Sequence, residues 1–386
     1  MMNPIRQLGN RFSQGWQART PKEAVRAFGT ASKPWLRDGM AEVLAKVGAT
    51  SPSRFARGAL TIVTFHRVLP ADKLRLYPIP GLAVTPEQLK LVLSELVQHF
   101  ECDSVIGCFR RWKGGARSER PLCAISFDDG ALDNYEHARP VLAELGVKAS
   151  FYIPVNNVEE ALPPWHDRLG FAILRSIAAV RKTPEKGFEA LLAPFGVQVA
   201  TFAALLPRDA ILLAAAGVTE AKKLTPDERE AALHALERAL GEDVVPDFAG
   251  MMTWDQVREL HQDGHEIGSH SLTHPLLPGL GEDRVRAEVV DSRRQLSKLI
   301  GAEVASFCYP NGSYDERTLK AVAAAGYECA VTTQWGLNRE QSPFELMRCD
   351  MDYARLETRL GEFSPERLWL RLSGLQPGLA APTPHY

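Results

Sequence analysis

Hydrophobic positions along the chain switch repeatedly between short β-branched runs and longer amphipathic stretches. The first clear strand is ALTIVTFHRV, which is bounded by Gly58 and Pro70. Up to residue 155 the pattern predicts, in order, a strand over 59–68, a helix over 85–100, a strand over 121–129, a helix over 134–146 and a strand over 148–155. Such strand–helix–strand alternation is typical of βα units around a parallel sheet.

The alternation stops between about 160 and 248, where the pattern is helical throughout. One helix is predicted over 225–241, because Thr225 and Glu228 form a capping box at its start. We interpret this stretch as a helical insertion between two strands, with the role of a lid or a packing element.

After the insertion the α/β pattern returns and continues to about residue 352. It predicts a helix over 253–264, a strand over 265–271, a helix over 282–301, a strand over 306–310, a helix over 316–326, a strand over 327–333 and a short strand within 346–351. The chain is thus divided into an N-terminal extension (1–57), an α/β unit (58–352) and a C-terminal helix with a loose tail (353–386).

Charge is unevenly distributed along the chain. The whole sequence of 386 residues has a net charge of −2, which argues against a nucleic-acid-binding protein. Residues 1–57, by contrast, carry ten Lys or Arg against three acids, with aromatic residues such as Trp16 and Trp35 among them. This composition fits either peripheral contact with an anionic membrane surface or a helical extension packed on the catalytic domain, and we prefer the second interpretation.

Six cysteines without a CxxC pair indicate buried thiols in a reducing compartment rather than a disulfide framework. The first sixteen residues contain no uninterrupted apolar run of the kind found in secretory signals. We therefore expect a cytoplasmic protein, either free or bound peripherally to the inner face of the membrane.

Two adjacent carboxylates, Asp128 and Asp129, end the apolar strand over 121–129. Neighbouring side chains that leave a strand point in different directions, so the two acids can serve different purposes. Because Gly130 follows, an ordinary acidic turn explains the same residues equally well.

A second candidate pair, His270 and His274, lies at the end of the strand over 265–271. Imidazoles at this spacing in a turn can converge on one cation, and two His with one carboxylate leave coordination positions open for a hydrolytic reaction. Asn311 lies in the turn Pro-Asn-Gly, which either aims a backbone N–H into a pocket or is a plain turn. His66 and Arg67 end the first strand, where a structural histidine is the simpler interpretation.

The segments SFDDG, GSHSLTH and FCYPNG, in this order, resemble the motifs of polysaccharide deacetylases of the NodB-homology type, carbohydrate esterase family 4. The resemblance covers roughly 58–155 and 249–352. The opening strand ending in HRV and the segment TWDQVREL are similar to the branch found among bacterial exopolysaccharide proteins.

This resemblance implies a distorted (β/α)7 barrel and metal-assisted attack of water on an N-acetyl carbonyl. By position, Asp128 would be the general base, and Asp129, His270 and His274 would hold one divalent ion, with zinc preferred. The backbone N–H of Asn311 would help to hold the oxyanion.

Two features depart from the family pattern. Cys308 stands where many members carry an Arg that orients the base, so that role is either absent or filled by Arg348. A late histidine that supplies the general acid is also missing, since only His385 follows His274. By resemblance to the exopolysaccharide branch, the acid is assigned to His66, with His166 as its rival. The neighbours of His166, Asp167 and Arg168, are interpreted as surface or capping groups.

The predicted function is removal of N-acetyl groups from amino sugars of a polysaccharide or a lipid-linked oligosaccharide. Two alternatives stay open. One is an amidohydrolase acting on a non-sugar C–N bond, and the other is a catalytically silent carbohydrate-binding protein of the same fold.

Overall fold

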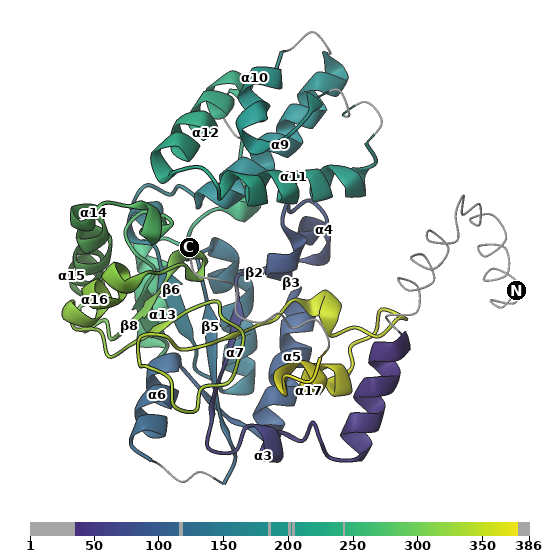
Figure 1. The fold of residues 1–386 in the computed structure, drawn as a ribbon, viewed down its shortest axis with the longest axis vertical. Helices are drawn as coiled ribbons and strands as arrows, with labels where there is room; N and C mark the ends of the chain where they lie inside the picture. Colours follow the sequence, from purple (N-terminus) through teal and green to yellow (C-terminus); the bar gives the residue numbers. More distant parts are fainter. Residues whose placement is uncertain are drawn as a thin grey trace, which may run out of the picture.

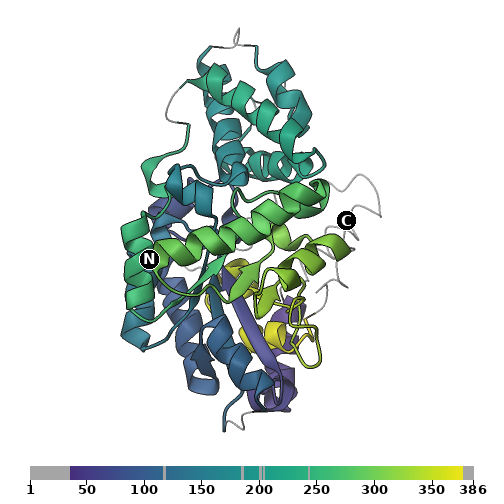
Figure 2. The same cartoon turned by 90° about the vertical axis from the view of Figure 1, so that its left-hand side faces the viewer.

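The computed structural model describes residues 35–115, 119–183, 187–199, 202, 205–241 and 244–376. A curled parallel sheet surrounded by helices forms the larger part of the molecule, and a group of helices caps one end of it (Figures 1 and 2). The strands along the main path are ordered β10-β1-β5-β6-β7-β8-β9. The expected α/β class is confirmed.

All strand pairs in this sheet are parallel. Their bounds are β1 Leu60–Phe65, β4 Glu101–Asp103, β5 Leu122–Phe127, β6 Ser150–Ile153, β7 Glu266–Ser269, β8 Ser306–Cys308, β9 Cys329–Val331 and β10 Cys349–Asp350. Strands β4 and β6 share one side of β5. Because Val331 of β9 bridges Leu346, just before β10, the two ends of the path approach each other and the sheet curls toward closure.

Helices cover the outside of this sheet and bury its apolar side chains. They are α5 Pro86–His99, α6 Val105–Lys113, α7 Arg139–Leu145, α13 Trp254–Gln262, α14 Glu282–Arg286, α15 Ser292–Ile300, α16 Glu316–Ala324 and α17 Pro365–Leu372. Between the sheet and these helices, the ring of Phe127 stacks on Phe65 at 5.4 Å and on Phe151 at 5.1 Å between centroids. Thr85 caps α5 and forms a complete capping box at its start.

The strand predicted over 59–68 is interrupted at His66 and resumes as β2 (Arg67–Val68), which pairs with β3 (Ala83–Val84) in a separate two-stranded sheet. Side chains after β5 cause the break. Asn134 Nδ2 donates to the carbonyl of His66 at 2.7 Å, and Asp133 Oδ1 accepts from the N–H of Val68 at 2.7 Å. These bonds replace the sheet ladder and turn the chain away immediately after β1.

The helix predicted over 282–301 is likewise not uniform, since a π-helical turn at Ala287–Asp291 separates α14 from α15. Such turns are frequent at functional sites because they re-aim side chains. Here the turn carries Glu288, a residue that holds the loop between His270 and His274.

The helical prediction for the insertion is confirmed by α9 Trp165–Lys182, α10 Glu189–Leu192, α11 Pro207–Ala221 and α12 Pro226–Leu240. These helices form their own apolar cluster, which includes Leu169, Val218 and Leu233. Because Tyr77 and Ala83 from the β2–β3 region belong to the same cluster, the insertion is joined to the barrel by packed side chains. Figures 1 and 2 show it stacked at one end of the barrel.

Much of the predicted N-terminal extension, residues 1–34, and the tail from residue 377 lie outside the described residues. Residues 35–46 are helical, and α3 spans Pro52–Phe55. Asp38 accepts a hydrogen bond at 2.8 Å from Arg367 of α17, so this part of the extension contacts the C-terminal helix. Among the described residues, no helix combines the length and apolar character that crossing a bilayer requires.

Candidate metal centre

The candidate site lies where several strands end at one rim of the curled sheet. Phe65 and Phe127 are in register at the ends of β1 and β5, so His66 and Asp128 leave the sheet at the same level. The N–H of Asp128 donates to the carbonyl of Phe65 at 3.1 Å. Because His270 directly follows β7, parallel topology brings three separate motifs to one place, as is usual for catalytic groups in such barrels.

Asp129, His270 and His274 form a buried trio of potential metal ligands whose donor atoms all lie within 4.8 Å of one another. Oδ1 of Asp129 is 3.4 Å from Nε2 of His270 and 3.1 Å from Nε2 of His274. Burial opposes ionisation of Asp129, but hydrogen bonds from the surrounding histidines outweigh it and hold its pKa well below the usual range. One carboxylate and two imidazoles match the donor set of a hydrolytic zinc-type site.

Backbone geometry separates the two acids. Asp129 adopts a left-handed conformation (φ 73°), followed by Gly130 (φ 66°), so the chain turns sharply as it leaves β5. Asp128 therefore faces Arg348 while Asp129 faces the histidines.

The loop that carries His274 is held in place by Glu288. Its carboxylate accepts from the N–H groups of Leu272 at 2.8 Å and Thr273 at 3.0 Å, and from the Thr273 hydroxyl at 2.6 Å. Ser271 and His274 both have positive φ, and the His274 N–H donates to Ser271 Oγ. These hydrogen bonds hold the loop in one conformation, so His274 is already in position before a metal ion binds.

His270 is oriented by the backbone of the neighbouring strand β8. Its Nδ1 lies 2.8 Å from the carbonyl oxygen of Cys308, which can only accept, so Nδ1 carries the proton. In the neutral form of His270 the lone pair is therefore on Nε2, the nitrogen that faces Asp129, which is the arrangement that metal-binding histidines adopt. For His274, burial lowers the pKa to about 4 and favours the neutral imidazole, the form that binds metals.

A second trio, Asp128, His270 and Cys308, also has donor atoms within 4.8 Å of one another. It is the poorer cation site. Both oxygens of Asp128 are already bonded by the guanidinium of Arg348, whose positive charge repels a metal ion. Burial also raises the pKa of the Cys308 thiol, and only the thiolate binds metals well.

Arg348 binds both carboxylate oxygens of Asp128. Nη1 donates to Oδ1 at 2.8 Å and Nη2 to Oδ2 at 2.7 Å, while Nε donates to the carbonyl of Thr332 at 2.7 Å. Burial opposes ionisation of Asp128, but the charge and hydrogen bonds of Arg348 outweigh it and lower its pKa. Arg348 thus fixes the orientation of the Asp128 carboxylate through both of its oxygens.

His66 lies beside the same carboxylate, with Nε2 at 3.7 Å from Oδ2 of Asp128. Burial is the main influence on its pKa and lowers it, while Asp128 partly opposes that effect. The imidazole thus lies next to Asp128 and lines the cavity above it.

His166 comes from the insertion and contacts the other acid. Its Nε2 is 3.4 Å from Oδ2 of Asp129, the oxygen that does not face His270 and His274. Burial lowers the pKa of His166, but its hydrogen bond with Asp129 outweighs that effect and the net shift is upward. Of the two candidates for the general acid, His66 therefore contacts Asp128, whereas His166 contacts Asp129.

The interpretation of Asp167 and Arg168 as surface or capping groups is wrong, since their exposed fractions are 1% and 3%. Asp167 accepts from Tyr77 at 2.5 Å and from Arg67 at 2.7 Å. Arg168 binds two acids of α12. Both side chains are buried by contacts with residues distant in sequence, which a local sequence pattern does not reveal.

Arg67 is placed beneath the site and bonds neither Asp128 nor Asp129. Its guanidinium is 2.7 Å from Asp133 and 2.7 Å from Asp167, so it joins the barrel to the start of α9. His66 directly precedes Arg67 in the chain, and His166 directly precedes Asp167. The ion pair therefore helps to fix the positions of both histidines.

These groups surround a cavity of about 370 Å³ between the rim and the insertion. Asn311 lines it in a left-handed conformation (φ 55°), and its side-chain oxygen accepts a hydrogen bond from Lys222 at 2.6 Å. Sequence reasoning missed the insertion's share of the lining, namely Trp165, Ala215, Val218, Thr219 and Lys222. The only local signal is the run Trp-His-Asp-Arg after a Pro-Pro pair, because the other residues lie on ordinary amphipathic helices.

Part of the chain matches a known protein family. Residues 223–330 match the family model described as polysaccharide deacetylase. This stretch carries a polysaccharide deacetylase signature. The match includes His270 and His274 and does not extend to Asp128 and Asp129.

Two curated relatives come from Bacillus subtilis. YxkH, named there as a candidate polysaccharide deacetylase, is 35% identical over 98 residues, which are 25% of this chain and 35% of that protein. YlxY, an uncharacterized protein, is 30% identical over 66 residues, or 17% of this chain and 21% of that one. The alignments thus span about a third or less of these relatives.

Among solved structures, a Streptococcus pyogenes deacetylase, PplD, in complex with acetate superposes with a TM-score of 0.52 at 17% identity. The superposition covers 81% of this chain and 98% of that one. Together with the curled seven-strand path, it confirms the expected distorted (β/α)7 barrel.

Proposed function

We propose that this protein is a metal-dependent hydrolase that removes N-acetyl groups from amino sugars of a polysaccharide or a lipid-linked oligosaccharide. The observation that carries the proposal is the division of the acidic pair. Asp129 faces two histidines with the geometry of a metal site, while Asp128 is held by Arg348 beside His66. The polysaccharide deacetylase signature in 223–330 supports the same reaction class.

The three proposed ligands are Asp129, His270 and His274, and zinc is the preferred ion because imidazole and carboxylate are its usual donors. A bound divalent ion would polarise the acetyl carbonyl and acidify a water molecule. The remaining chemistry falls to side chains that the structure places around the same cavity.

Asp128 is proposed to take the proton from the attacking water. Arg348 keeps this carboxylate ionised and fixes its orientation, so that it is available as a base near neutral pH. His66 is proposed to protonate the leaving amine. Its Nε2 lies 3.7 Å from Asp128, and a proton taken up by the acid is thus close to the group that delivers it.

The backbone N–H of Asn311 is the proposed donor to the oxyanion that forms on the acetyl group. Asn311 lines the cavity together with Asp128 and Asp129. A preorganised donor of this kind contributes roughly 3 kcal/mol to stabilising a transition state. Arg67 is proposed to make no contact with substrate, because its guanidinium is held in buried ion pairs with Asp133 and Asp167.

An acetate-release screen tests the proposal. Full-length protein loaded separately with zinc and other divalent metals is incubated with N-acetylhexosamine oligomers, and released acetate is measured. Acetate should appear with one or more metals, and His66→Ala should lower turnover by about 10²–10⁴-fold with metal content unchanged. Metal-loaded protein that releases no acetate from any oligomer would overturn the assignment.

A further inference from the structure

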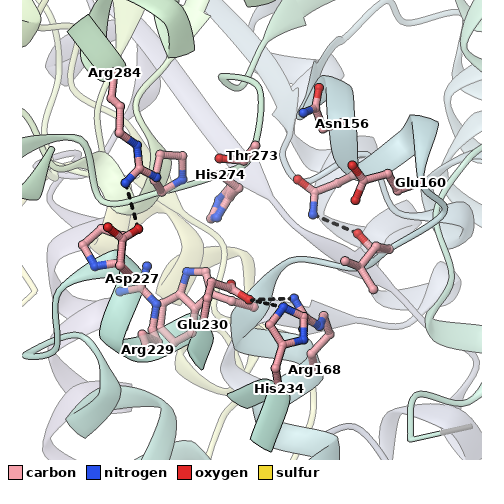
Figure 3. Close-up of a pocket in the computed structure, with 15 residues that line it drawn as sticks. Asn156, Glu160, Arg168, Asp227, Arg229, Glu230, His234, Thr273, His274 and Arg284 are labelled. Carbon is pink, nitrogen blue, oxygen red and sulfur yellow. Dashed lines mark hydrogen bonds and ion pairs between the residues drawn. The ribbon is translucent and has the colours of Figure 1, made fainter. Parts of the chain in front are cut away.

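A second cavity, of about 210 Å³, opens between the insertion and the barrel rim next to the metal centre. Trp165 and His274 line both cavities, so the two adjoin at these side chains. Figure 3 shows His274 on one side of this pocket, with Arg168 and Arg229 of the insertion across from it.

Arg229 of α12 is unusual among the residues around this pocket. Its exposed fraction is 1%, yet neither Nε nor Nη1 has a hydrogen-bond partner among the described residues. The guanidinium carbon lies over the ring of Trp165, 4.2 Å from its centroid. Stacking on an aromatic ring stabilises a cation only partly, and a buried charge without an anionic partner is costly.

The other arginines around the pocket already have acidic partners. Arg168 is 2.7 Å from Glu237. It is also 3.1 Å from Glu230, and Arg284 is 2.8 Å from Asp227 (Figure 3). Glu230 is the acid that acts on the charge of Arg229, but Arg168 already bonds it. The charge of Arg229 therefore stays largely uncompensated.

A second cation, Lys222, follows α11 and points toward the metal centre. The side chain is exposed, and its ammonium group donates to Oδ1 of Asn311 at 2.6 Å; no carboxylate lies within 4.0 Å of it among the described residues. Partial burial of the ammonium group and the charge of Arg229 lower the pKa of Lys222. Lys222 lines the cavity of the metal centre and Arg229 lines the adjoining pocket, while Trp165, on which Arg229 stacks, lines both. An anion placed where the two cavities meet would therefore have a cation from each lining nearby.

We propose that Arg229 and Lys222 form a subsite for an oxyanion, a phosphate or carboxylate group that the substrate carries next to its acetamido sugar. This inference rests on the proposed function, since it describes the substrate of the same centre. Guanidinium and ammonium groups are the usual binders of such oxyanions, and Arg229 has unpartnered N–H donors at the edge of a guanidinium whose plane is stacked on Trp165. The insertion thereby selects the substrate by charge.

Calorimetry with metal-loaded, full-length protein tests the subsite. Three probes are compared: N-acetylglucosamine, its 1-phosphate, and N-acetylmuramic acid, which carries a carboxylate. We expect at least one anionic sugar to bind about tenfold or more tightly than the neutral sugar. The arm that shows the preference identifies the anion as phosphate or carboxylate.

Variants locate the preference. Arg229→Gln and Lys222→Gln should each reduce it about tenfold, while Arg229→Lys should retain part of it. Arg284→Gln is the matched control, because Arg284 lines the same pocket but is paired with Asp227, and it should keep the preference. Lys222 is exposed, so its variant stays informative if Arg229→Gln folds poorly.

Equal binding of all three sugars, or an anion preference that survives in both glutamine variants, would overturn the subsite. Acetate release separates this result from the proposed function. If the anionic sugars bind as expected but no acetylated sugar releases acetate, the deacetylase assignment fails and the subsite stands. If neutral oligomers are deacetylated but the anionic sugars bind no more tightly than the neutral sugar, the subsite fails and the assignment stands.

Discussion

The barrel rim and the helical insertion contribute to the same cavity in different ways. On the rim, the ionised groups are paired, as Asp128 is with Arg348 and Asp129 is with His270 and His274. On the insertion, Lys222 and Arg229 present charges without carboxylate partners among the described residues. Paired groups on strand ends are rigid and suited to chemistry, while unpaired charges on helices are suited to recognition.

A buried ion pair helps to join the two regions, where Arg67 of β2 bonds Asp167 of α9. Through this pair, His166 of the insertion reaches the carboxylate of Asp129. We therefore expect changes on the rim to affect catalysis most. Changes in the insertion should affect metal affinity, stability or substrate choice.

The largest effect is expected from Asp128→Asn, which removes the proposed base but keeps its shape. Turnover should fall by about 10²–10⁴-fold with metal content unchanged, because Asp128 is not among the proposed ligands. Acetate release and metal analysis on the same sample measure both quantities. A variant that keeps full activity would show that the base lies elsewhere and that the rim does not perform the chemistry alone.

Because Arg348 acts on Asp128, Arg348→Met should change both the pH dependence of activity and the stability of the protein. Arg348 lowers the pKa of this acid in the folded state, so its removal raises that pKa and moves the acidic limb of kcat/KM to higher pH. Breaking the buried pair should also cost about 3–5 kcal/mol of unfolding free energy near neutral pH.

The sign of the stability effect follows from linkage. An acid with a lowered folded pKa stabilises the fold above its unfolded value of about 3.9, and that stabilisation disappears as pH falls through the folded pKa. The difference between wild type and Arg348→Met, measured by urea unfolding, should therefore shrink as the medium is acidified. Arg348→Lys, which keeps the charge, is the control, and an unchanged acidic limb in Arg348→Met would exclude this role.

His166→Ala should weaken metal binding by about 10–100-fold, since His166 contacts the Asp129 oxygen that faces away from the other histidines. Competition with a chelating dye measures the affinity. His234→Ala, an exposed histidine on the same insertion, should leave it unchanged. Unaltered metal affinity in His166→Ala would mean that the insertion does not support the centre.

Asp167→Asn is expected to have the smallest effect, a loss of about 1.5 kcal/mol in unfolding free energy, because Arg67 keeps its bond to Asp133. Denaturant unfolding measures the change. Asp227→Asn, an exposed acid of the same insertion, provides the comparison. Equal stability of the two variants would show that the buried pair does not fasten the insertion to the barrel.

Much of the fold was predictable because local patterns specify local structure. The capping box at Thr225 and the apolar run of β5 placed a helix and a strand correctly. The break at His66 was not predictable, since it is made by hydrogen bonds from Asp133 and Asn134, far along the chain. Element type follows from neighbours in sequence, whereas interruptions follow from contacts between elements.

By itself, the sequence determined the acidic pair at a strand end, the histidine spacing and the barrel rim where parallel strands would bring them together. Only the tertiary structure decided which oxygen faces which histidine, that Arg348 reaches Asp128, and that His166 reaches Asp129 instead. The physical reason is that strand register is a repeating property that a pattern encodes. Side-chain direction and burial, by contrast, depend on every element packed around the site.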